Sequence, residues 1–214
     1  MYSIINEYLL YKLIPFIANV SPFLFLIILV LYCIMYPSYK TVYLFIMYIL
    51  VNISIWIEKE LIAKPFYAMF GTNNILPILG LGSRPKTCPK PKLDITNSIL
   101  LYLEPIIEKY IPLTFGMPSG HCQIVWTIAI YLICYLLFVN LDTITYSSVI
   151  YNFVYIFAIV SIALYISYSR VFIEKCHTIQ QAIVGSVIGI ISGLLIYYFE
   201  NDIIYIVKYY LQRI

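Results

Sequence analysis

Charged side chains are scarce in this chain of 214 residues. Only 11% of the residues are Asp, Glu, Lys or Arg, whereas 63% are hydrophobic. Soluble domains carry roughly 25% charged residues, so this composition excludes an ordinary soluble domain and indicates an integral membrane protein. The net charge of +3 is small and scattered along the chain. The sequence therefore also lacks the dense basic patch of a nucleic-acid-binding protein.

Other absences narrow the class of protein further. The five cysteines form no C-x-x-C pair, which argues against a zinc site, and their odd number argues against a disulfide framework. No basic segment precedes the first apolar residues, so we expect no cleavable signal peptide. The middle of each long apolar run carries no charge, which argues against the ion path of a transporter or channel.

Five apolar runs approach or exceed the roughly 20 residues that cross a bilayer as a helix. A further segment, Pro65–Ser83, is uncharged but broken by Gly71 and Pro77, and is expected to be irregular or re-entrant, or else a sixth crossing. The fold predicted is an all-α, polytopic membrane bundle of five to six transmembrane helices, with residues 1–214 forming one domain. The five runs are Ser21–Tyr36, Thr41–Ile57, Cys122–Val139, Thr143–Tyr168 and Thr178–Phe199. The second run is short and could extend through Glu58–Ala63.

Three further segments are predicted to be helical or interfacial outside these spans. Ile4–Val20 and the amphipathic tail Asp202–Ile214 suit the membrane interface, and Thr96–Tyr110 suits a short helix in the long connection before Pro118. In the last span, Gly185, Gly189 and Gly193 are spaced by four residues. Such small residues let helices approach closely in lipid, so packing is the simplest explanation for them.

The two histidines of the chain lie in polar clusters at the ends of predicted spans. His121 follows Pro118-Ser119-Gly120 at the start of one run, and His177 follows Ser169-Arg170 at the end of another. Counting crossings places Arg84, His121, Arg170 and His177 on one face of the membrane. Unrelated polar residues would not be expected to lie on the same face of the membrane.

The segment Pro118–His121 is a turn that opens a helix. The first amides of a helix lack intrahelical partners and, with the helix dipole, favour an anion. His121 would stand beside that anion, placed to give a proton to a departing oxygen. Taken alone, a turn with an incidental histidine explains the same residues.

The second cluster offers the groups of phosphoryl transfer. Arg170 matches phosphate oxygens with its planar fork, and a neutral His177 can attack phosphorus. Gln181 lies one helical turn beyond His177 and could orient its ring. Taken singly, Arg170 and His177 are equally well explained as interfacial polar residues, and Arg84 as a solvated loop residue.

Together these elements resemble the type 2 phosphatidic acid phosphatase superfamily, whose signature is K-x6-RP, PSGH and SR-x5-H-x3-D. The second part is intact at Pro118–His121. The first part keeps Arg84-Pro85, but Pro77 stands at its lysine position, and Lys64 or Lys86 is the candidate replacement. The third part has one additional residue before His177.

The segments around both histidines are similar to the dolichyl-diphosphatase branch. That branch tends to have G-M-P-S-S-H-S-Q and S-R-V-Y…H-T-x-x-Q, and this chain reads G-M-P-S-G-H-C-Q from Gly116 and S-R-V-F from Ser169. In this branch a glutamine stands where others have the acidic residue, which matches Gln181.

The resemblance implies a metal-free and cofactor-free lipid phosphatase of the endoplasmic reticulum or another endomembrane. The substrate implied is a lipid phosphate or diphosphate, above all a polyprenyl diphosphate of the dolichyl type. His177 would be the nucleophile, His121 the acid and base, and Gln181 the orienting residue. Arg84, Arg170, Lys86 and the Ser119 and Gly120 amides would bind phosphate. The alternative is a non-catalytic membrane protein of the same fold that binds lipid phosphate or acts as a scaffold.

Two questions stay open at this point. The basic residues gather on the motif face, which the positive-inside rule assigns to the cytoplasm, whereas the resembling branch acts in the lumen. The additional residue before His177 requires a non-helical connection across Ile173–Cys176, because an insertion in a continuous helix would rotate His177 by about 100°. Glu174 is expected to be the looped-out residue, and the sequence predicts that Arg84 and His121 share one pocket.

Overall fold

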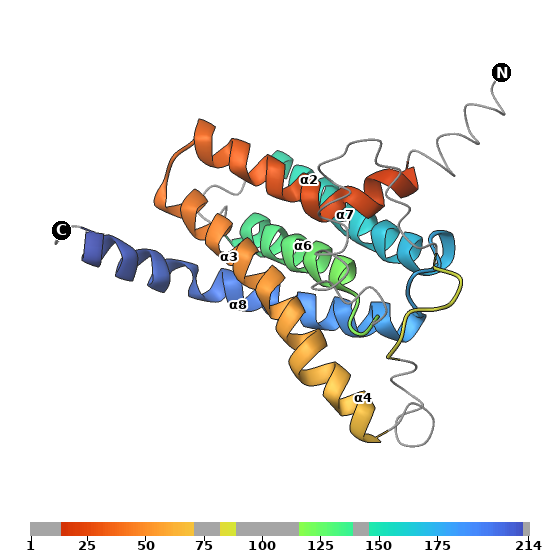
Figure 1. Cartoon of the computed structure of the whole chain (residues 1–214). Helices are drawn as coiled ribbons and strands as arrows, with labels where there is room; N and C mark the ends of the chain where they lie inside the picture. The colour runs from red at the N-terminus through yellow and green to blue at the C-terminus, as the bar shows by residue number, and fades with distance from the viewer. Residues whose placement is uncertain (1–13, 71–81, 89–115, 139–145, 212–214) are drawn as a thin grey trace, which may run out of the picture.

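The computed structural model describes residues 14–70, 82–88, 116–138 and 146–211, and the described residues form helices and no strand. Figure 1 shows the helices running side by side as a bundle. The all-helical membrane bundle predicted from the sequence is confirmed. The elements are α2 (Ile14–Met35), α3 (Tyr39–Ile57), the π-helical turn η2 (Glu58–Ala63), α4 (Lys64–Phe70), α6 (Gly120–Phe138), α7 (Tyr146–Tyr168), the π-helical turn η4 (Ser169–Ile173) and α8 (Ile179–Leu211).

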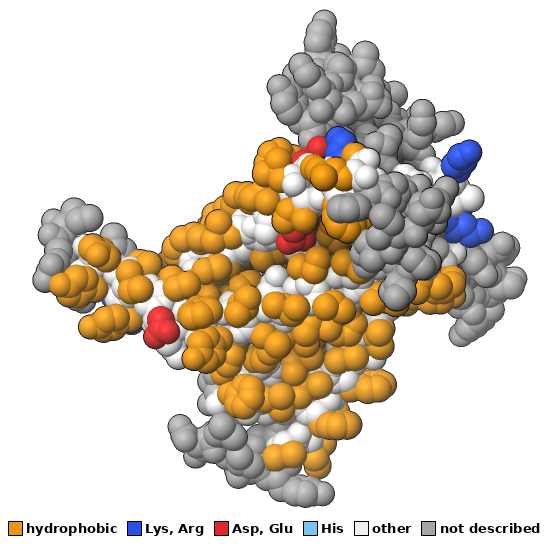
Figure 2. Space-filling model, turned by 90° about the horizontal axis from the view of Figure 1, so that it is seen from below, with side chains coloured by type: hydrophobic (Ala, Val, Ile, Leu, Met, Phe, Trp, Pro, Cys, Tyr) orange, Lys and Arg blue, Asp and Glu red, His pale blue; other side chains and the backbone are white. Residues whose placement is uncertain are grey.

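Among the described residues, four helical segments are long and apolar enough to cross a bilayer, and a shorter apolar helix covers Ser21–Met35. The helical form follows from the setting, because in lipid every backbone amide and carbonyl must be satisfied within the chain. Figure 2 shows an almost unbroken apolar surface, with Lys and Arg side chains gathered at one end. The four long segments are Tyr39–Met69, Gly120–Phe138, Val149–Ile173 and Ile179–Tyr210.

Helix α6 is the centre of the bundle and contacts α2, α3, α7 and α8 (Figure 1). Its closest neighbour is α8, where the predicted glycine stripe lies on the backbone of α6. A Cβ atom added at Gly185, Gly189 or Gly193 would lie only 2.4, 2.4 or 2.6 Å from the carbonyl oxygens of Ser119, Gln123 and Thr127, respectively. Only glycine permits this approach. The shared spacing of four residues shows that α6 and α8 run parallel.

Helix α3 is capped at its start and continues past its predicted end. Ser38 Oγ accepts a hydrogen bond from the Thr41 amide at 3.2 Å, and the Ser38 amide donates to Thr41 Oγ1 at 3.0 Å, which forms a capping box. At the other end, η2 and α4 prolong the helix to Phe70. The expectation of irregular structure from Pro65 onward is therefore wrong for Pro65–Phe70. The wide π-helical turn before Pro65 gives room to a ring that would clash inside a regular helix.

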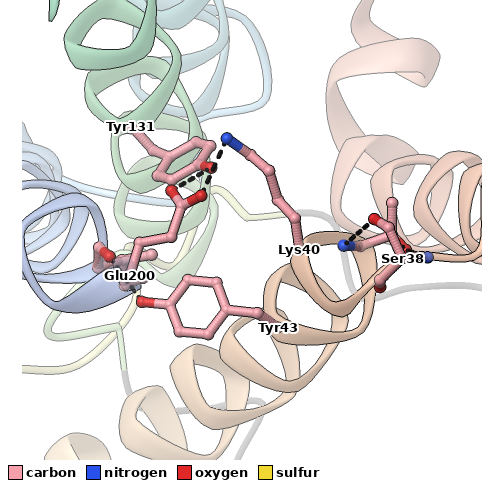
Figure 3. Close-up of polar contacts among 7 residues, drawn as sticks. Ser38, Lys40, Tyr43, Tyr131 and Glu200 are labelled. Atoms are coloured by element: carbon pink, nitrogen blue, oxygen red, sulfur yellow. Dashed lines mark hydrogen bonds and ion pairs between the residues drawn. The ribbon is translucent and has the colours of Figure 1, made fainter. Parts of the chain in front are cut away.

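Helix α8 is also longer than predicted, because it includes the first part of the tail that was expected to be a separate interfacial segment. Glu200, placed just beyond the predicted span, is buried and binds two other helices (Figure 3). Lys40 Nζ lies 2.9 Å from one carboxylate oxygen, and Tyr131 donates its hydroxyl to the other at 2.8 Å. This cluster ties α3, α6 and α8 together at the end of the bundle opposite η2.

Some predictions fall on residues outside the described part of the chain. These are the interfacial segment before Ile14, the rest of the candidate sixth crossing at 71–81, the short helix Thr96–Tyr110 and the start of the span at Thr143.

Candidate functional site

Three segments that are far apart in the sequence meet at one end of the bundle. The amides of Gly116 and Met117 donate to the Gly82 carbonyl at 2.8 and 3.2 Å, which joins the first motif segment to the second. Gln181 Nε2 donates to the Ser83 carbonyl at 2.8 Å, which joins the first to the third. In Figure 1 the segment at 82–88 lies beside the connection between α7 and α8. These bonds bring the three predicted motifs into one site.

A covalent bond also joins the first and third segments, contrary to the expectation from the odd cysteine count. Cys88 and Cys176 form a disulfide with their Cα atoms 4.3 Å apart. Beside it, the Thr87 hydroxyl donates to the Lys175 carbonyl at 3.2 Å. The cysteine count missed the pair because three other cysteines, Cys33, Cys122 and Cys134, are free. The disulfide holds the loop of Arg84 against the loop of His177.

The connection before His177 is non-helical from Glu174 onward, as its spacing predicted, whereas Ile173 still belongs to the π-helical turn η4. It runs from Glu174 to Thr178, and α8 begins at Ile179, two residues after His177. The amides of Cys176 and His177 both donate to the Arg170 carbonyl, at 3.1 and 3.2 Å. This turn folds back on the end of α7, so that His177 and Arg170 lie together.

The expectation that Glu174 is looped out is wrong. The Glu174 amide donates to the Ser169 carbonyl at 2.8 Å, a bond across five residues that closes the π-helical turn η4. A π-helical turn holds one residue more than an α-helical turn, so the additional residue widens the end of the helix. Lys175 follows with a φ of 53°, in the left-handed region that reverses the chain direction.

The ring of His177 is buried, with 2% of the residue exposed, and one nitrogen is held in place. Nδ1 lies 3.1 Å from the Gly116 carbonyl and 3.2 Å from Gln181 Oε1. A backbone carbonyl can only accept, so Nδ1 carries the proton in the neutral ring. The lone pair is then on Nε2, the nitrogen that could attack phosphorus.

The electrostatic surroundings keep this ring neutral. Burial lowers the pKa of His177 far below its usual value, and the positive charges of Arg170, Arg84 and Lys59 lower it further, with a contribution from His121. A protonated ring would have no lone pair to donate. The same cations that would bind a phosphoryl group therefore also keep the candidate nucleophile unprotonated.

Gln181 contacts His177, as the sequence suggested, and it also contacts two other segments of the site. It is fully buried, and its Oε1 also accepts from the Thr178 amide at 3.2 Å. The packing around it is tight, because a Cβ atom at Gly116 would lie 2.6 Å from Gln181 Oε1. Its amide group thus contacts His177, the loop of Ser83 and the segment of Gly116 at once, which fixes the ring of His177.

Two arginines lie at the site where the motifs predicted them. Arg170 is 3% exposed and forms an ion pair with Glu174. Burial lowers the pKa of Arg84, and the neighbouring charge of Arg170 lowers it further, while Glu174 opposes the shift. The Arg84 Nε atom is buried and has no hydrogen-bond partner among the described residues. Repulsion between two close guanidinium groups is relieved by an anion between them.

A third cation, Lys59, was missed by the sequence analysis. Lys59 belongs to η2 and interacts electrostatically with Arg84, Arg170 and His177. Of the two candidates for the absent motif lysine, Lys64 pairs with Glu60 at 3.0 Å on the surface, and Lys86 is exposed on the loop that follows Arg84. Lys59 lies 25 residues before Arg84, so a search near the Arg-Pro pair could not find it. The acidic neighbours Glu58 and Glu60 also made it resemble a surface residue.

The segment Ser119–His121 opens α6 as predicted, but one of its amides is already engaged. The Ser119 carbonyl accepts from the Gln123 amide at 3.0 Å, so Ser119 is the capping residue. Its own amide donates to the Gln181 carbonyl at 3.1 Å. The expectation that the Ser119 amide binds phosphate is thereby corrected. The Gly120 amide begins the helix, and His121 stands partly exposed in the first turn.

The arrangement is a buried neutral histidine under three cations, with a second histidine at a helix N-terminus. Groups arranged in this way are able to bind an anion and to attack phosphorus. A model of the PAP2 superfamily matches residues 41–205, from α3 to α8. No curated protein and no solved structure is detectably similar to the chain.

Proposed function

The chain belongs to the PAP2 superfamily, and from that premise we propose that it is a lipid phosphatase working through a phosphohistidine. Members of this superfamily are phosphatases acting on lipid phosphates. The single observation that supports catalysis most is the pair of contacts at His177 Nδ1, with the Gly116 carbonyl at 3.1 Å and Gln181 Oε1 at 3.2 Å. They leave Nε2 as the free nitrogen beside the cations.

The proposed reaction has two steps. In the first, His177 Nε2 forms a bond to phosphorus, the bond from phosphorus to the lipid oxygen breaks, and His121 gives a proton to that oxygen. In the second, His121 takes a proton from water, the hydroxide attacks phosphorus, and the bond to Nε2 breaks. Arg84, Arg170 and Lys59 stabilise the charge on the phosphoryl oxygens in both steps.

We propose a polyprenyl diphosphate as the substrate, cleaved to the monophosphate. The support is the sequence around the two histidines, above all Gln181 in the position of the usual acidic residue. The leaving group would then be a lipid monophosphate, which needs less protonation than an alcohol. The site lies where α7 ends and α6 and α8 begin, at one end of these helices, so that a headgroup could bind there while its isoprenoid chain stays in the bilayer.

We also propose that the site faces the lumen of the endoplasmic reticulum or another endomembrane compartment. Disulfides persist in oxidising compartments and are rare in the cytosol, and Cys88–Cys176 lies beside the site. The positive-inside rule instead assigns this face to the cytoplasm. A glycosylation acceptor inserted within Lys86–Lys92 decides between the lumenal and the cytoplasmic orientation, because only a lumenal loop would be modified.

The test of activity is phosphate release from purified protein in detergent without added metal. Polyprenyl diphosphate, polyprenyl monophosphate and phosphatidic acid are compared, with His177→Ala as the inactive variant. A radiolabelled terminal phosphate should label the wild type with an acid-labile adduct that His177→Ala lacks. His121→Ala should lose less activity on the diphosphate than on the monophosphate. Binding of all lipids without any release would support the non-catalytic alternative.

A further inference from the structure

A carboxylate beside the two arginines of the site has no part in the proposed mechanism. Glu174 forms an ion pair with Arg170 Nη1, and Ser169 donates its hydroxyl to Glu174 Oε1 at 3.3 Å. The side chain is 12% exposed, so it is turned inward although it belongs to a connection between helices. Arg84, on the first motif segment, interacts with the same carboxylate electrostatically. An anion supplied by the protein itself thus lies among the anion-binding groups.

Carboxylate and phosphoryl oxygens compete for the same donors. Arginine binds either group through its planar fork, and the hydrogen-bonding geometry is similar. The partners of Glu174 come from the two segments that carry the predicted phosphate ligands, η4 and the segment of Arg84. A phosphoryl group that takes the place of the Glu174 carboxylate against Arg170 Nη1 therefore has to displace it.

A simpler explanation is a permanent ion pair that neutralises a buried arginine. Such pairs are common between residues four apart on a helix. Glu174, however, ends the π-helical turn, and Lys175 follows with a positive φ. The carboxylate can therefore leave by side-chain rotation without unwinding η4. The two explanations differ in their outcome, because a permanent pair would survive substrate binding and support it.

We propose that Glu174 is an internal competitor for the phosphoryl site, seated on Arg170 and Ser169 when no substrate is bound and displaced when one binds. This inference rests on the proposed function, since it assigns the same site to phosphate. It predicts that Glu174 weakens the binding of phosphate and of lipid phosphates. It also gives Glu174 a role in ligand selectivity, because a monoanionic ligand would displace its carboxylate less readily than a dianionic phosphate.

The test measures binding of inorganic phosphate to the full-length purified protein through the rise in its thermal unfolding temperature. Glu174→Gln removes the charge and keeps the size of the side chain. We expect its half-saturating phosphate concentration to fall roughly tenfold, which corresponds to the net contribution of one charge-assisted hydrogen bond. The KM for lipid phosphate should fall in parallel, with kcat little changed.

Two more variants make the result decisive. Asp202→Asn removes an exposed carboxylate of α8, far along the helix from the site, and should leave phosphate binding unchanged. Glu174→Asp keeps the charge but shortens the side chain, and should give an intermediate value; it also serves if Glu174→Gln fails to fold. Phosphate binding that is unchanged or weaker in Glu174→Gln, or in Glu174→Asp if only that variant folds, overturns the competitor role while leaving the phosphatase proposal intact. If phosphate stabilises neither wild type nor variants, the anion site and the competitor role fail together.

Discussion

Lys59 and Gly120 meet across two helices: a Cβ atom at Gly120 would lie 3.8 Å from Lys59 Nζ. Lys59 belongs to the π-helical turn η2, and Gly120 is the first residue of α6. The ammonium group therefore lies at the helix N-terminus where the motif predicts a bound anion. We therefore expect Lys59, from a preceding helix, to take the role of the missing motif lysine.

Lys59→Met should weaken phosphate binding by about ten- to a hundredfold, since a hydrogen bond to a charged group contributes roughly 1.5–3 kcal/mol. The measurement is phosphate inhibition of lipid phosphate hydrolysis. Lys64→Met and Lys86→Met are the matched controls, because both side chains are exposed, and both should resemble the wild type. If Lys86→Met weakened phosphate binding and Lys59→Met did not, Lys86 would be the replacement for the motif lysine, as the sequence suggested.

Gln181→Leu should lower kcat by about ten- to a hundredfold while leaving KM for the lipid within a few fold. Leucine cannot accept from His177 Nδ1 or donate to the Ser83 carbonyl, but the Gly116 carbonyl still fixes the tautomer. Gln181→Glu keeps an acceptor for Nδ1 and should retain more activity than Gln181→Leu. Equal losses in the two variants would show that the contact with Ser83, not the one with His177, is what matters.

The glycine stripe of α8 offers a test that separates packing from chemistry. Gly185→Ala and Gly193→Ala should each cost about 1–3 kcal/mol of stability, because each methyl group would meet a carbonyl oxygen of α6. Only Gly185 lies against Ser119, next to the site, so only Gly185→Ala should also lose activity per folded molecule. Thermal unfolding in detergent and specific activity measure the two effects. If Gly185→Ala and Gly193→Ala had equal specific activities, the displacement of Ser119 by the added methyl group would not disturb the site.

The stability of the protein should fall in mild acid because of His177. Its pKa is lowered in the folded state by burial and neighbouring cations, so the unfolded chain binds a proton first. The pKa of a histidine in the unfolded chain is about 6.5. Above that pH the His177 ring is neutral in both the folded and the unfolded chain, and its titration does not change the free energy of unfolding. As the pH falls below that value, unfolding gains up to about 1.4 kcal/mol per pH unit from this group. His177→Gln should remove that part of the slope when unfolding is followed from pH 7.5 to 5.5; an unchanged slope would contradict the neutral ring.

The sequence predicted the helical class, four of the long spans and the meeting of Arg84, Arg170 and His177, and the pocket shared by Arg84 and His121 stays a prediction. Apolar run length predicts a membrane helix directly, because the bilayer thickness sets it. Counting crossings then places motif residues on one face without any knowledge of packing. The non-helical connection before His177 was also predictable, since a continuous helix would have turned the ring away.

Other features depend on contacts that spacing does not reveal. Lys59 joins the site only because α3 continues through a π-helical turn, which brings it beside α6. The role of Glu174 was misjudged because a polar residue in a connection is usually solvated, whereas here it turns toward Arg170. Glu200 is buried only because Lys40 and Tyr131 reach it from two other helices. In each case the deciding partner lies on another element.

The bond between Cys88 and Cys176 imposes an order on biogenesis. Cys88 precedes α6 and Cys176 follows α7, so both helices lie within the ring that the bond closes. During synthesis the second cysteine becomes available only after this helical hairpin has entered the membrane and returned. A chain in which only one of the two helices crossed would hold its two thiols on opposite sides of the bilayer. Covalent closure of the site therefore excludes this misinserted form, and an oxidised, fast-migrating band on a non-reducing gel would distinguish molecules with paired crossings of α6 and α7 from molecules with a single crossing.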